Sequence, residues 1–576
     1  MNKLFKSIGL LSIFILSDMC VFSQDKDVLD TVKFEIVQGY TPTISDAFKK
    51  NDAPKVDFTP PEQPKLGYSI SSNKFSSDFK VMPVQPARIK GEPLQKLYRG
   101  YVKLGGGAPG ILYGEGFYNE LRSRKHSWGI HAKHLSSTGN IKDYAYSGYA
   151  DTKANVYGKK FLKKHTLSGG IDFDLNTVHF YGLDTGIYQL SDGQDTAKFS
   201  LNDSIIGEDN IKKSITRING YSRLRSHFKD SSALNYDVRL KYYLLNDNYG
   251  TEENAFLLNG DFSRYIEKEF LLVQATIDYN DDKYYKEADS SISYANTIIG
   301  FYPSISTAGD KYKFIVGING SADLGKNFNE YIVFPRVYFS YDLIMDILVP
   351  YVGIGGSIVR NSYAKLVKEN PFVISDPLIN NIKNSIRFYG GFKGEFSASS
   401  SFNISITRDK LENQYFFVND TSGILHNRFN LVYDNVKLLK LSGEFSYMIR
   451  DKFKFMLLGD VYNYTTDREE MPWHTPNYNI TFSGSYNLKE KIIVKLDVFA
   501  LGPQWAKIYV PLETSMVMKA VKLDGIIDVN LGLEYRYTKK LSAFVQLNNL
   551  AAQQYNRWNY YPMQRFNLLG GLTYIF

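Results

Sequence analysis

Apolar and polar residues alternate with a period of two along several segments of the chain. The last thirteen residues, 564–576 (QRFNLLGGLTYIF), show the pattern best and end on a phenylalanine. Because successive side chains of a strand point to opposite faces, this segment predicts a strand with one wholly apolar face, as a strand that closes a barrel in lipid requires. The residues predicted on that face are Phe566, Leu568, Gly570, Leu572, Tyr574 and Phe576.

Four other segments carry apolar residues on one face and charged residues on the other, namely residues 234–244, 271–279, 492–498 and 528–537. A charged face is too costly to bury in a dry core, so we expect it to line a water-filled lumen while the apolar face meets lipid. Their mixed signs favour a network that braces the wall over a ring that selects ions. The charges predicted in the lumen are Asp237, Arg239, Lys241, Lys495, Asp497, Asp528, Glu534 and Arg536.

The connections between these strand-like segments alternate between short turns, such as residues 162–165, and longer loops, such as residues 360–383. Ten turns and eleven loops predict about 22 strands. The expected fold is all-β, a transmembrane antiparallel up-and-down β-barrel over residues 95–576. Its least regular strands are expected at Pro335 and Pro350, since proline removes a hydrogen bond of the ladder and a closed barrel has no free edge.

The first residues are typical of a secretory signal peptide. Lys3 and Lys6 precede a short apolar run at residues 8–16, which is too short to span a bilayer. We expect cleavage after Ser23, so that residues 1–23 are removed. A lipid anchor on Cys20 is the alternative, although the large Met19 directly before it does not fit a lipidation site.

Residues 24–94 differ in kind from the rest, being polar, poorly periodic and rich in proline. They predict an extended periplasmic arm. The segment 40–48 (YTPTISDAF) has more large apolar side chains than its flanks. It is either a docking motif for a periplasmic or barrel protein or a linker that carries a few large residues. The docking residues would be Tyr40, Pro42, Ile44 and Phe48.

Composition narrows the class of protein further. The chain of 576 residues has 44 Tyr and 38 Phe and is 15% aromatic but only 43% hydrophobic, and beyond the signal it lacks an apolar run of about 18 residues. A barrel with aromatic girdles in a bacterial outer membrane fits this balance better than a bundle of membrane helices. The net charge of +8 is modest and does not require nucleic acid as a partner. Loss of Cys20 with the signal would leave no cysteine for disulfides or thiolate metal sites.

No segment carries a phosphate-binding loop, a GxSxG nucleophile elbow or an HExxH helix. We therefore predict no catalytic residue, no cofactor and no metal, and a protein that is not an enzyme. Aromatic residues on or beside the predicted external loops could contact a sugar or a partner. The alternative is the outer aromatic girdle of the barrel. These candidates are Trp473, His474, Trp505, Trp558 and Tyr560.

The ending at residues 548–576 (NNLAAQQYNRWNYYPMQRFNLLGGLTYIF) and residues 471–476 (MPWHTP) resemble the TonB-dependent receptor superfamily, and more narrowly its Bacteroidetes barrels. The resemblance covers essentially residues 95–576. It implies a multi-pass barrel in the outer membrane whose closing strand is recognised by the assembly machinery. In that family a globular plug of well over a hundred residues fills the lumen, whereas residues 25–94 show neither a plug pattern nor the box that the energy-transducing partner pulls.

The expected function is transport through the outer membrane, or membership of an outer-membrane complex, by a barrel without a full plug. The first alternative is a structural subunit of a complex that assembles or exports surface proteins, docked through the arm. The second is an outer-membrane hydrolase with a catalytic group at the rim. Whatever closes the lumen is expected to be the long loops, the arm or another protein.

Overall fold

The computed structural model describes residues 97–576 apart from residues 122, 140, 191–197, 231, 287–289, 327–328, 451 and 513–514. The signal peptide, the arm and its candidate docking residues lie outside the described residues. The first barrel strand begins at Gly100, within the range predicted for the barrel.

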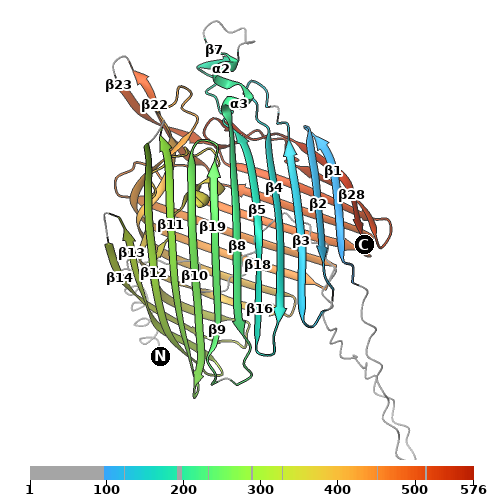
Figure 1. Ribbon diagram of the computed structural model, residues 1–576, viewed down its shortest axis with the longest axis vertical. Coiled ribbons are helices and arrows are strands. Elements are labelled where there is room, and N and C mark those ends of the chain that lie inside the picture. Colours follow the sequence, from blue (N-terminus) through green and yellow to red (C-terminus); the bar gives the residue numbers. More distant parts are fainter. Residues whose placement is uncertain are drawn as a thin grey trace, which may run out of the picture. The chain divides into compact units, whose positions relative to one another are not determined.

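Within this part of the chain, 22 strands form one closed sheet in which each strand pairs antiparallel with the next along the chain (Figure 1). The last strand returns to the first, with Tyr101 opposite Ile575 and Ala108 opposite Leu568. The predicted fold and strand number are confirmed. The strands are β1 Gly100–Ala108, β2 Ile111–Asn119, β3 His126–Ser137, β4 Tyr149–Phe161, β5 His165–His179, β8 Lys212–Ser226, β9 Asn235–Asp247, β10 Thr251–Ile266, β11 Glu269–Lys286, β12 Ser290–Ala308, β13 Tyr312–Gly325, β14 Asn329–Tyr341, β15 Val349–Val359, β16 Ile382–Ser397, β17 Ser400–Asn419, β18 Phe429–Ile449, β19 Phe453–Thr466, β20 Tyr478–Leu488, β21 Ile492–Leu501, β24 Ile526–Arg536, β25 Leu541–Asn548 and β28 Asn567–Ile575.

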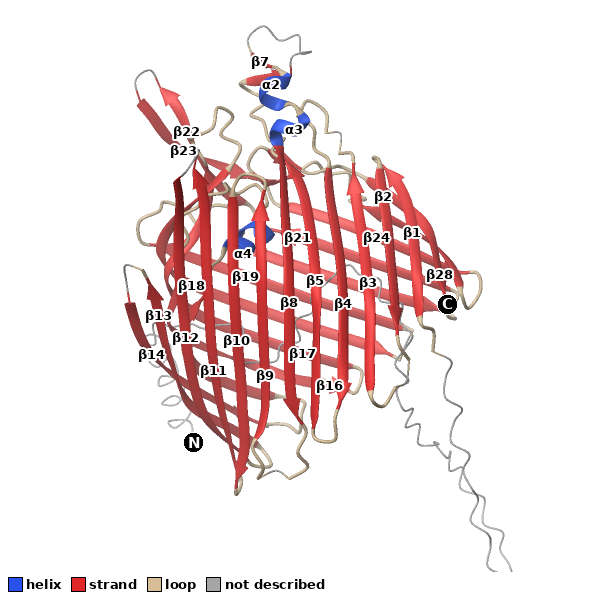
Figure 2. Ribbon diagram, in the orientation of Figure 1, coloured by secondary structure: helices blue, strands red, loops and turns tan. Residues whose placement is uncertain are grey.

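The other described elements belong to connections at one end of the barrel. Helices α2 and α3, with β6 and β7, interrupt the connection from β5 to β8, and α4 lies between β15 and β16 (Figure 2). A hairpin of β22 and β23 follows β21, and a short hairpin of β26 and β27 follows β25. Their bounds are β6 Tyr188–Leu190, β7 Phe199–Leu201, α2 Asp203–Ile206, α3 Glu208–Ile211, α4 Tyr363–Glu369, β22 Gln504–Leu512, β23 Ser515–Leu523, β26 Asn556–Trp558 and β27 Tyr561–Pro562.

The two ends of the barrel differ in the length of their connections. Ten connections meet at the end where β1 starts and β28 stops, and the longest of them are residues 227–234. Eleven meet at the other end, and they include residues 180–211, 360–381 and 502–525. Short periplasmic turns and longer external loops are typical of outer-membrane barrels, so the long-loop end is the external one.

The outer surface of the barrel is an apolar belt. On β28, Leu568, Leu572 and Tyr574 are 38%, 57% and 48% exposed, whereas Leu569 and Thr573 between them are buried. The structure thus places the predicted closing face on the outside, and Phe566 and Phe576 at its two ends are exposed as well. Exposure of so large an apolar surface is unfavourable in water but is expected on a face that contacts lipid. The predicted multi-pass arrangement in an outer membrane is confirmed by this belt on a closed barrel.

The ladder is shortest where proline was expected to disturb it. Strand β14 pairs with β15 over only four positions, Val337 to Ser340, although it pairs with β13 along its whole length. Pro335 lies just beyond this short ladder, where a missing N–H costs no bond to β15. Where β14 and β15 no longer pair, the Asn319 side-chain amide of β13 donates to the Gly356 carbonyl of β15 (3.0 Å). Pro350 pairs with Phe392 of β16.

Candidate functional site

Connections at the long-loop end fold over the lumen and pack against one another. The ring of Phe372 stacks on that of Tyr561 with centroids 3.7 Å apart, and Tyr181 meets Tyr561 edge-on at 5.0 Å. The Tyr561 hydroxyl donates to the Asn427 carbonyl (2.7 Å), and the Tyr181 hydroxyl donates to the Pro562 carbonyl (2.9 Å). We call this cap the loop lid. It is built from residues 180–190, 198–211, 360–381, 420–428, 467–477 and 549–566.

The loop lid has the dry core of a small soluble domain. Tyr363, Leu366 and Val373 have no exposed surface, and Tyr561 is 1% exposed. Burial raises the pKa of Tyr363 and of Tyr561 well above the ordinary tyrosine value, so both hydroxyls stay protonated and donate hydrogen bonds. The core joins connections that leave the barrel at widely separated strands.

The candidate contact residues of the loops are part of this core. Trp473, His474 and Trp558 are at most 4% exposed, while Trp505 and Tyr560 are half-buried. An external ligand or a lipid girdle would need these side chains at a surface. The structure instead buries Trp473, His474 and Trp558, because the connections pack against each other, and it leaves Trp505 and Tyr560 partly exposed.

His474 is held in its neutral form. Its Nδ1 lies 2.8 Å from the Phe417 carbonyl, to which it donates, and its Nε2 accepts from the Asn559 backbone N–H at 3.3 Å. Burial lowers the pKa of His474 to about 4, and the charge of Arg557 acts in the same direction. The ring packs edge-on against Phe429 at 5.2 Å. His474 is therefore a structural hydrogen-bonding group at ordinary pH.

The deepest part of the lid is the connection between β15 and β16, residues 360–381, which we call the strap. Its helix α4 begins at Ser362, whose side chain accepts from the Lys365 N–H at 3.2 Å. The helix is buried on most sides and lies among the barrel strands (Figure 2). The Lys213 ammonium of β8 donates to the Val373 carbonyl of the strap at 2.6 Å.

Polar bonds fasten the strap to strands far from its own. The Tyr363 hydroxyl donates to Asp247 of β9 (2.5 Å), and the Ala364 N–H donates to the Glu253 carboxylate of β10 (2.6 Å). Arg360 donates to Asp278 of β11 at 3.1 Å. Strand β9 lies six strands from β15 along the pairing order, so the strap reaches the wall of the barrel far from its own strands.

The predicted lumen charges on β9 lie on the inner face, and two of them pair with charges on neighbouring strands. Asp237 accepts two hydrogen bonds from Arg223 of β8, one of them 2.8 Å long at Nε. Arg239 forms an ion pair with Asp261 of β10. Lys241 lies over the Tyr243 ring, 5.4 Å from its centroid.

The other predicted lumen charges share the inner face of β21 and β24. Asp497 accepts from the Ser483 hydroxyl (2.7 Å) and Asp528 from the Tyr555 hydroxyl (2.6 Å). The Arg536 guanidinium lies 3.5 Å from Glu534, and Lys495 stands in register between Ser485 and Gly532. The hydroxyl bonds of Asp497 and Asp528 and the ion pair of Arg536 with Glu534 join neighbouring parts of the wall, which suits a bracing network.

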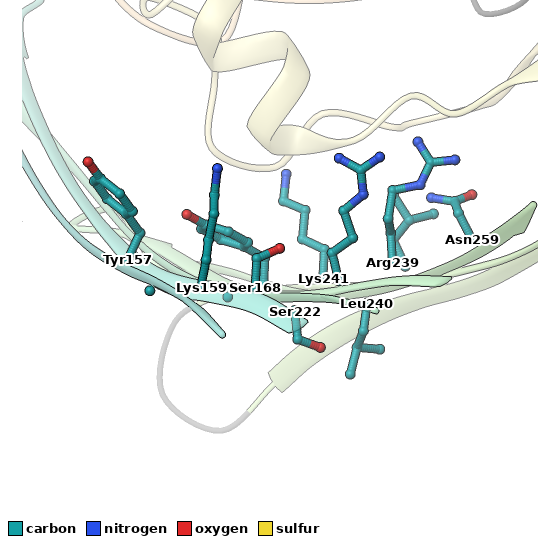
Figure 3. A pocket seen from close by; sticks show the side chains of 13 residues that line it. Tyr157, Lys159, Ser168, Ser222, Arg239, Leu240, Lys241 and Asn259 are labelled. Atoms are coloured by element: carbon teal, nitrogen blue, oxygen red, sulfur yellow. The ribbon is translucent and has the colours of Figure 1, made fainter. Parts of the chain in front are cut away.

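Beneath α4 the wall of β4, β5, β8, β9 and β10 holds a pocket of about 440 Å³. In Figure 3 the side chains of Tyr157, Lys159, Arg239, Lys241 and Asn259 point to the side of the sheet where the helix lies, whereas Ser222 and Leu240 point away. Its lining includes four cations and no carboxylate; the cations are Lys159, Arg223, Arg239 and Lys241.

Arg239 and Lys241 were among the predicted lumen charges, whereas Lys159 and Arg223 were not. Both lie on strands, residues 149–161 and 212–226, in which inward and outward side chains alternate. Assigning the inward positions of these two segments would have predicted them. The bonding partners Glu253 and Asp247 of the strap had no comparable signal, because their role depends on a connection more than a hundred residues later.

Within the described residues, no group of three or more His, Asp and Glu side chains is arranged to hold a metal ion. The helices of this part of the chain are all too short or too polar to cross a membrane. The arm residues, the recognition of the closing strand by assembly machinery and the protein partners stay predictions.

Comparison with known proteins identifies the fold only. No family model matches the chain, and neither does any curated protein. Among solved structures, the ferripyoverdine receptor of the outer membrane of Pseudomonas aeruginosa is similar over 84% of this chain and 72% of its own, with a TM-score of 0.63 and 14% identity.

Two further solved structures are similar in the same way. The siderophore receptor PirA from Acinetobacter baumannii has a TM-score of 0.62 at 10% identity, covering 84% of this chain and 81% of its own. The ferric-catecholate import receptor Fiu from Escherichia coli K12 has a TM-score of 0.60 at 11% identity, covering 84% and 82%. The barrel type that the ending predicted is thus confirmed as a fold.

Proposed function

We propose that the protein is a non-enzymatic outer-membrane transport barrel whose external mouth is gated by its own loop lid and strap. The observation that carries the proposal is the strap, which lies inside the long-loop end of the barrel and is fastened by hydrogen bonds to strands β8 to β11. A barrel that served only as an anchor would need neither a charged 22-strand lumen nor a built closure. Of the similar structures, one is named a receptor of the outer membrane and another an import receptor, which supports transport.

The strap would open by exchanging its wall contacts for water. The bonds of Tyr363 to Asp247 and of Ala364 to Glu253 join polar groups that water can also satisfy. The aromatic core at Phe372 and Tyr561 is harder to separate, because its burial is favourable only while it stays dry. We therefore expect the strap and the core of the lid to contribute differently to opening.

Planar-bilayer conductance tests the gate. The purified full chain should conduct little, and replacement of residues 361–381 by a short Gly-Ser linker should give large, stable open channels. Replacement of residues 516–518 at the β22–β23 hairpin, which stands outside the barrel mouth, is the matched control and should leave conductance low (Figure 1). Equal conductance in the full chain and the strap-deleted chain would contradict the gate.

We also propose that residues 24–94 are an arm and do not form a full plug, in the manner of the Bacteroidetes barrels that the ending resembles. Deletion of residues 24–94 should then leave the closed state unchanged in the same measurement. Channels that open on this deletion alone would show that the arm closes the lumen.

The structural alternative, a subunit of a complex docked through residues 41–48, rests on the composition of that segment. Purification from the native outer membrane tests it. A stoichiometric partner that is lost on deletion of residues 41–48 would favour the alternative, and a lone barrel would exclude it.

A further inference from the structure

The pocket beneath α4 concentrates positive charge in a way that costs stability. Arg223 of β8 is paired directly with Arg239 of β9. Lys159 of β4 lies in the same row across the sheet, because Ser168 of β5 is paired with both Lys159 and Arg223. Like charges in directly opposed positions destabilise a sheet. Asp237 and Asp261 are paired with each other in the neighbouring row, which lies nearer the short turns. Their bonds to Arg223 and Arg239 offset part of the repulsion between the two arginines.

The guanidinium groups keep hydrogen-bonding capacity on the pocket side. Each guanidinium carries five N–H donors, and the bonds of Arg223 to Asp237 use two of them. Arg217 of β8 and Lys368 of α4 add to the positive potential at Lys241, and Asp172 and Asp174 of β5 act against it. A pocket with four cationic side chains and no acidic lining attracts an anion, and its low-dielectric walls strengthen the attraction.

The next row of the wall adds apolar side chains beside the cations. Tyr157, Gly170, Tyr221, Lys241 and Leu257 stand in register across five strands. The Tyr221 ring lies across Gly170, where an added Cβ would come within 2.7 Å of its hydroxyl. The glycine therefore makes room for a flat aromatic surface beside the cations.

We propose that this pocket binds a small organic oxyanion, a phosphate or carboxylate joined to an apolar ring. The anionic group lies among Lys159, Arg239 and Lys241, and the ring lies against Tyr157 and Tyr221. The volume of about 440 Å³ is within the range of ligand pockets. This inference rests on the proposed function, for which it names the class of solute, and it places the solute directly beneath the strap.

Titration calorimetry on the full chain in lipid nanodiscs tests the proposal with four probes. Phenyl phosphate and benzoate carry the two oxyanions on one ring, phenol is the neutral ring, and inorganic phosphate is the anion alone. Phenyl phosphate, benzoate or both should bind saturably and more weakly at high salt, whereas phenol should not bind. The stronger of the two distinguishes a phosphate from a carboxylate solute.

Lys159→Gln and Lys241→Gln should each weaken binding roughly tenfold, the loss of one charge-assisted hydrogen bond. Lys393→Gln is the matched control, because Lys393 also stands on the inner face beside two tyrosine rings, 5.9 Å from Tyr338 and 5.7 Å from Tyr351, but outside the pocket. Its affinity should equal that of the unchanged chain.

Absence of saturable binding by both ring oxyanions would overturn the proposal, as would an equal loss in Lys393→Gln. Binding that appears only after deletion of residues 24–94 would assign the pocket to the arm and also overturn it. The gate is judged separately by conductance. Open channels after strap deletion without oxyanion binding would reject the pocket alone, and binding without such channels would reject the gate alone.

Discussion

The loop lid and the lumen wall are two interiors of one molecule built on opposite principles. The lid excludes water with stacked and edge-on rings such as Phe372, Tyr561 and Tyr181. The wall faces the lumen with ion pairs such as Arg217 with Asp174, whose side chains keep 34% and 23% exposure. The contrast shows that a barrel can draw its rigidity from the strand ladder while its closure depends on hydrophobic packing.

The largest expected effect is at the centre of the lid. Tyr561→Ala removes a fully buried ring and should cost the lid about 3–5 kcal/mol, because the cavity left between Phe372 and Tyr181 cannot collapse. Hydrogen exchange of amides in residues 549–566 measures this loss. The thermal transition of the barrel should stay where it is, since the strand ladder is untouched. Tyr574→Ala, on the lipid face, is the control, and equal exchange in both variants would contradict a packed lid.

A second effect separates the two interiors by pH. His474 is neutral in the folded lid with its pKa lowered to about 4, whereas an unfolded histidine has a pKa near 6.5. As pH falls from about 6.5 towards 4, the unfolded segment binds a proton that the folded lid does not, so the lid loses stability, by about 3 kcal/mol at pH 4. The stability is fully present above pH 6.5.

Comparison with His474→Gln isolates the contribution of this one side chain to the pH dependence of the lid. The difference between the two chains in hydrogen exchange of residues 467–477 should shrink steadily from pH 7 to pH 4. A difference that does not change with pH would mean that folding leaves the pKa of His474 unchanged, which would contradict its burial as a neutral group.

The smallest effect is expected in the wall. A double-mutant cycle with Arg217→Gln and Asp174→Asn should give a coupling of about 0.2–1 kcal/mol in the unfolding of the barrel, because the pair is partly exposed to lumen water. A coupling above about 2 kcal/mol would show that the wall is as dry as the lid and would remove the contrast between them.

Much of the wall could be predicted from the sequence, because strand alternation is a local property. The closing face at Leu568, Leu572 and Tyr574 follows from residues two apart, and so does the inward position of Asp237 and Arg239. Short turns such as residues 162–164 and 489–491 carry local signals of their own. Two of the four cations of the pocket were predicted. The other two were not, because alternation assigns the inward positions of one strand at a time and the pocket combines side chains from several strands.

The loop lid could not be predicted in this way. Tyr181 and Pro562 share a hydrogen bond across 381 positions of the chain, and Lys213 bonds to Val373 across 160. Trp473 and Trp558 were assigned to external contacts or to the girdle because they lie in connections, and connections usually stay at the surface. Only the direction in which the connections fold decides that these side chains are buried.

The sequence by itself determined a closed barrel of about 22 strands with a lipid face and a charged lumen, because a period of two fixes the face of each side chain without knowledge of any distant residue. The tertiary structure alone decided that connections from widely separated strands share one buried core, and that four cations meet beneath α4. Those features depend on contacts between segments far apart in the chain, whose strength comes from burial and charge in three dimensions.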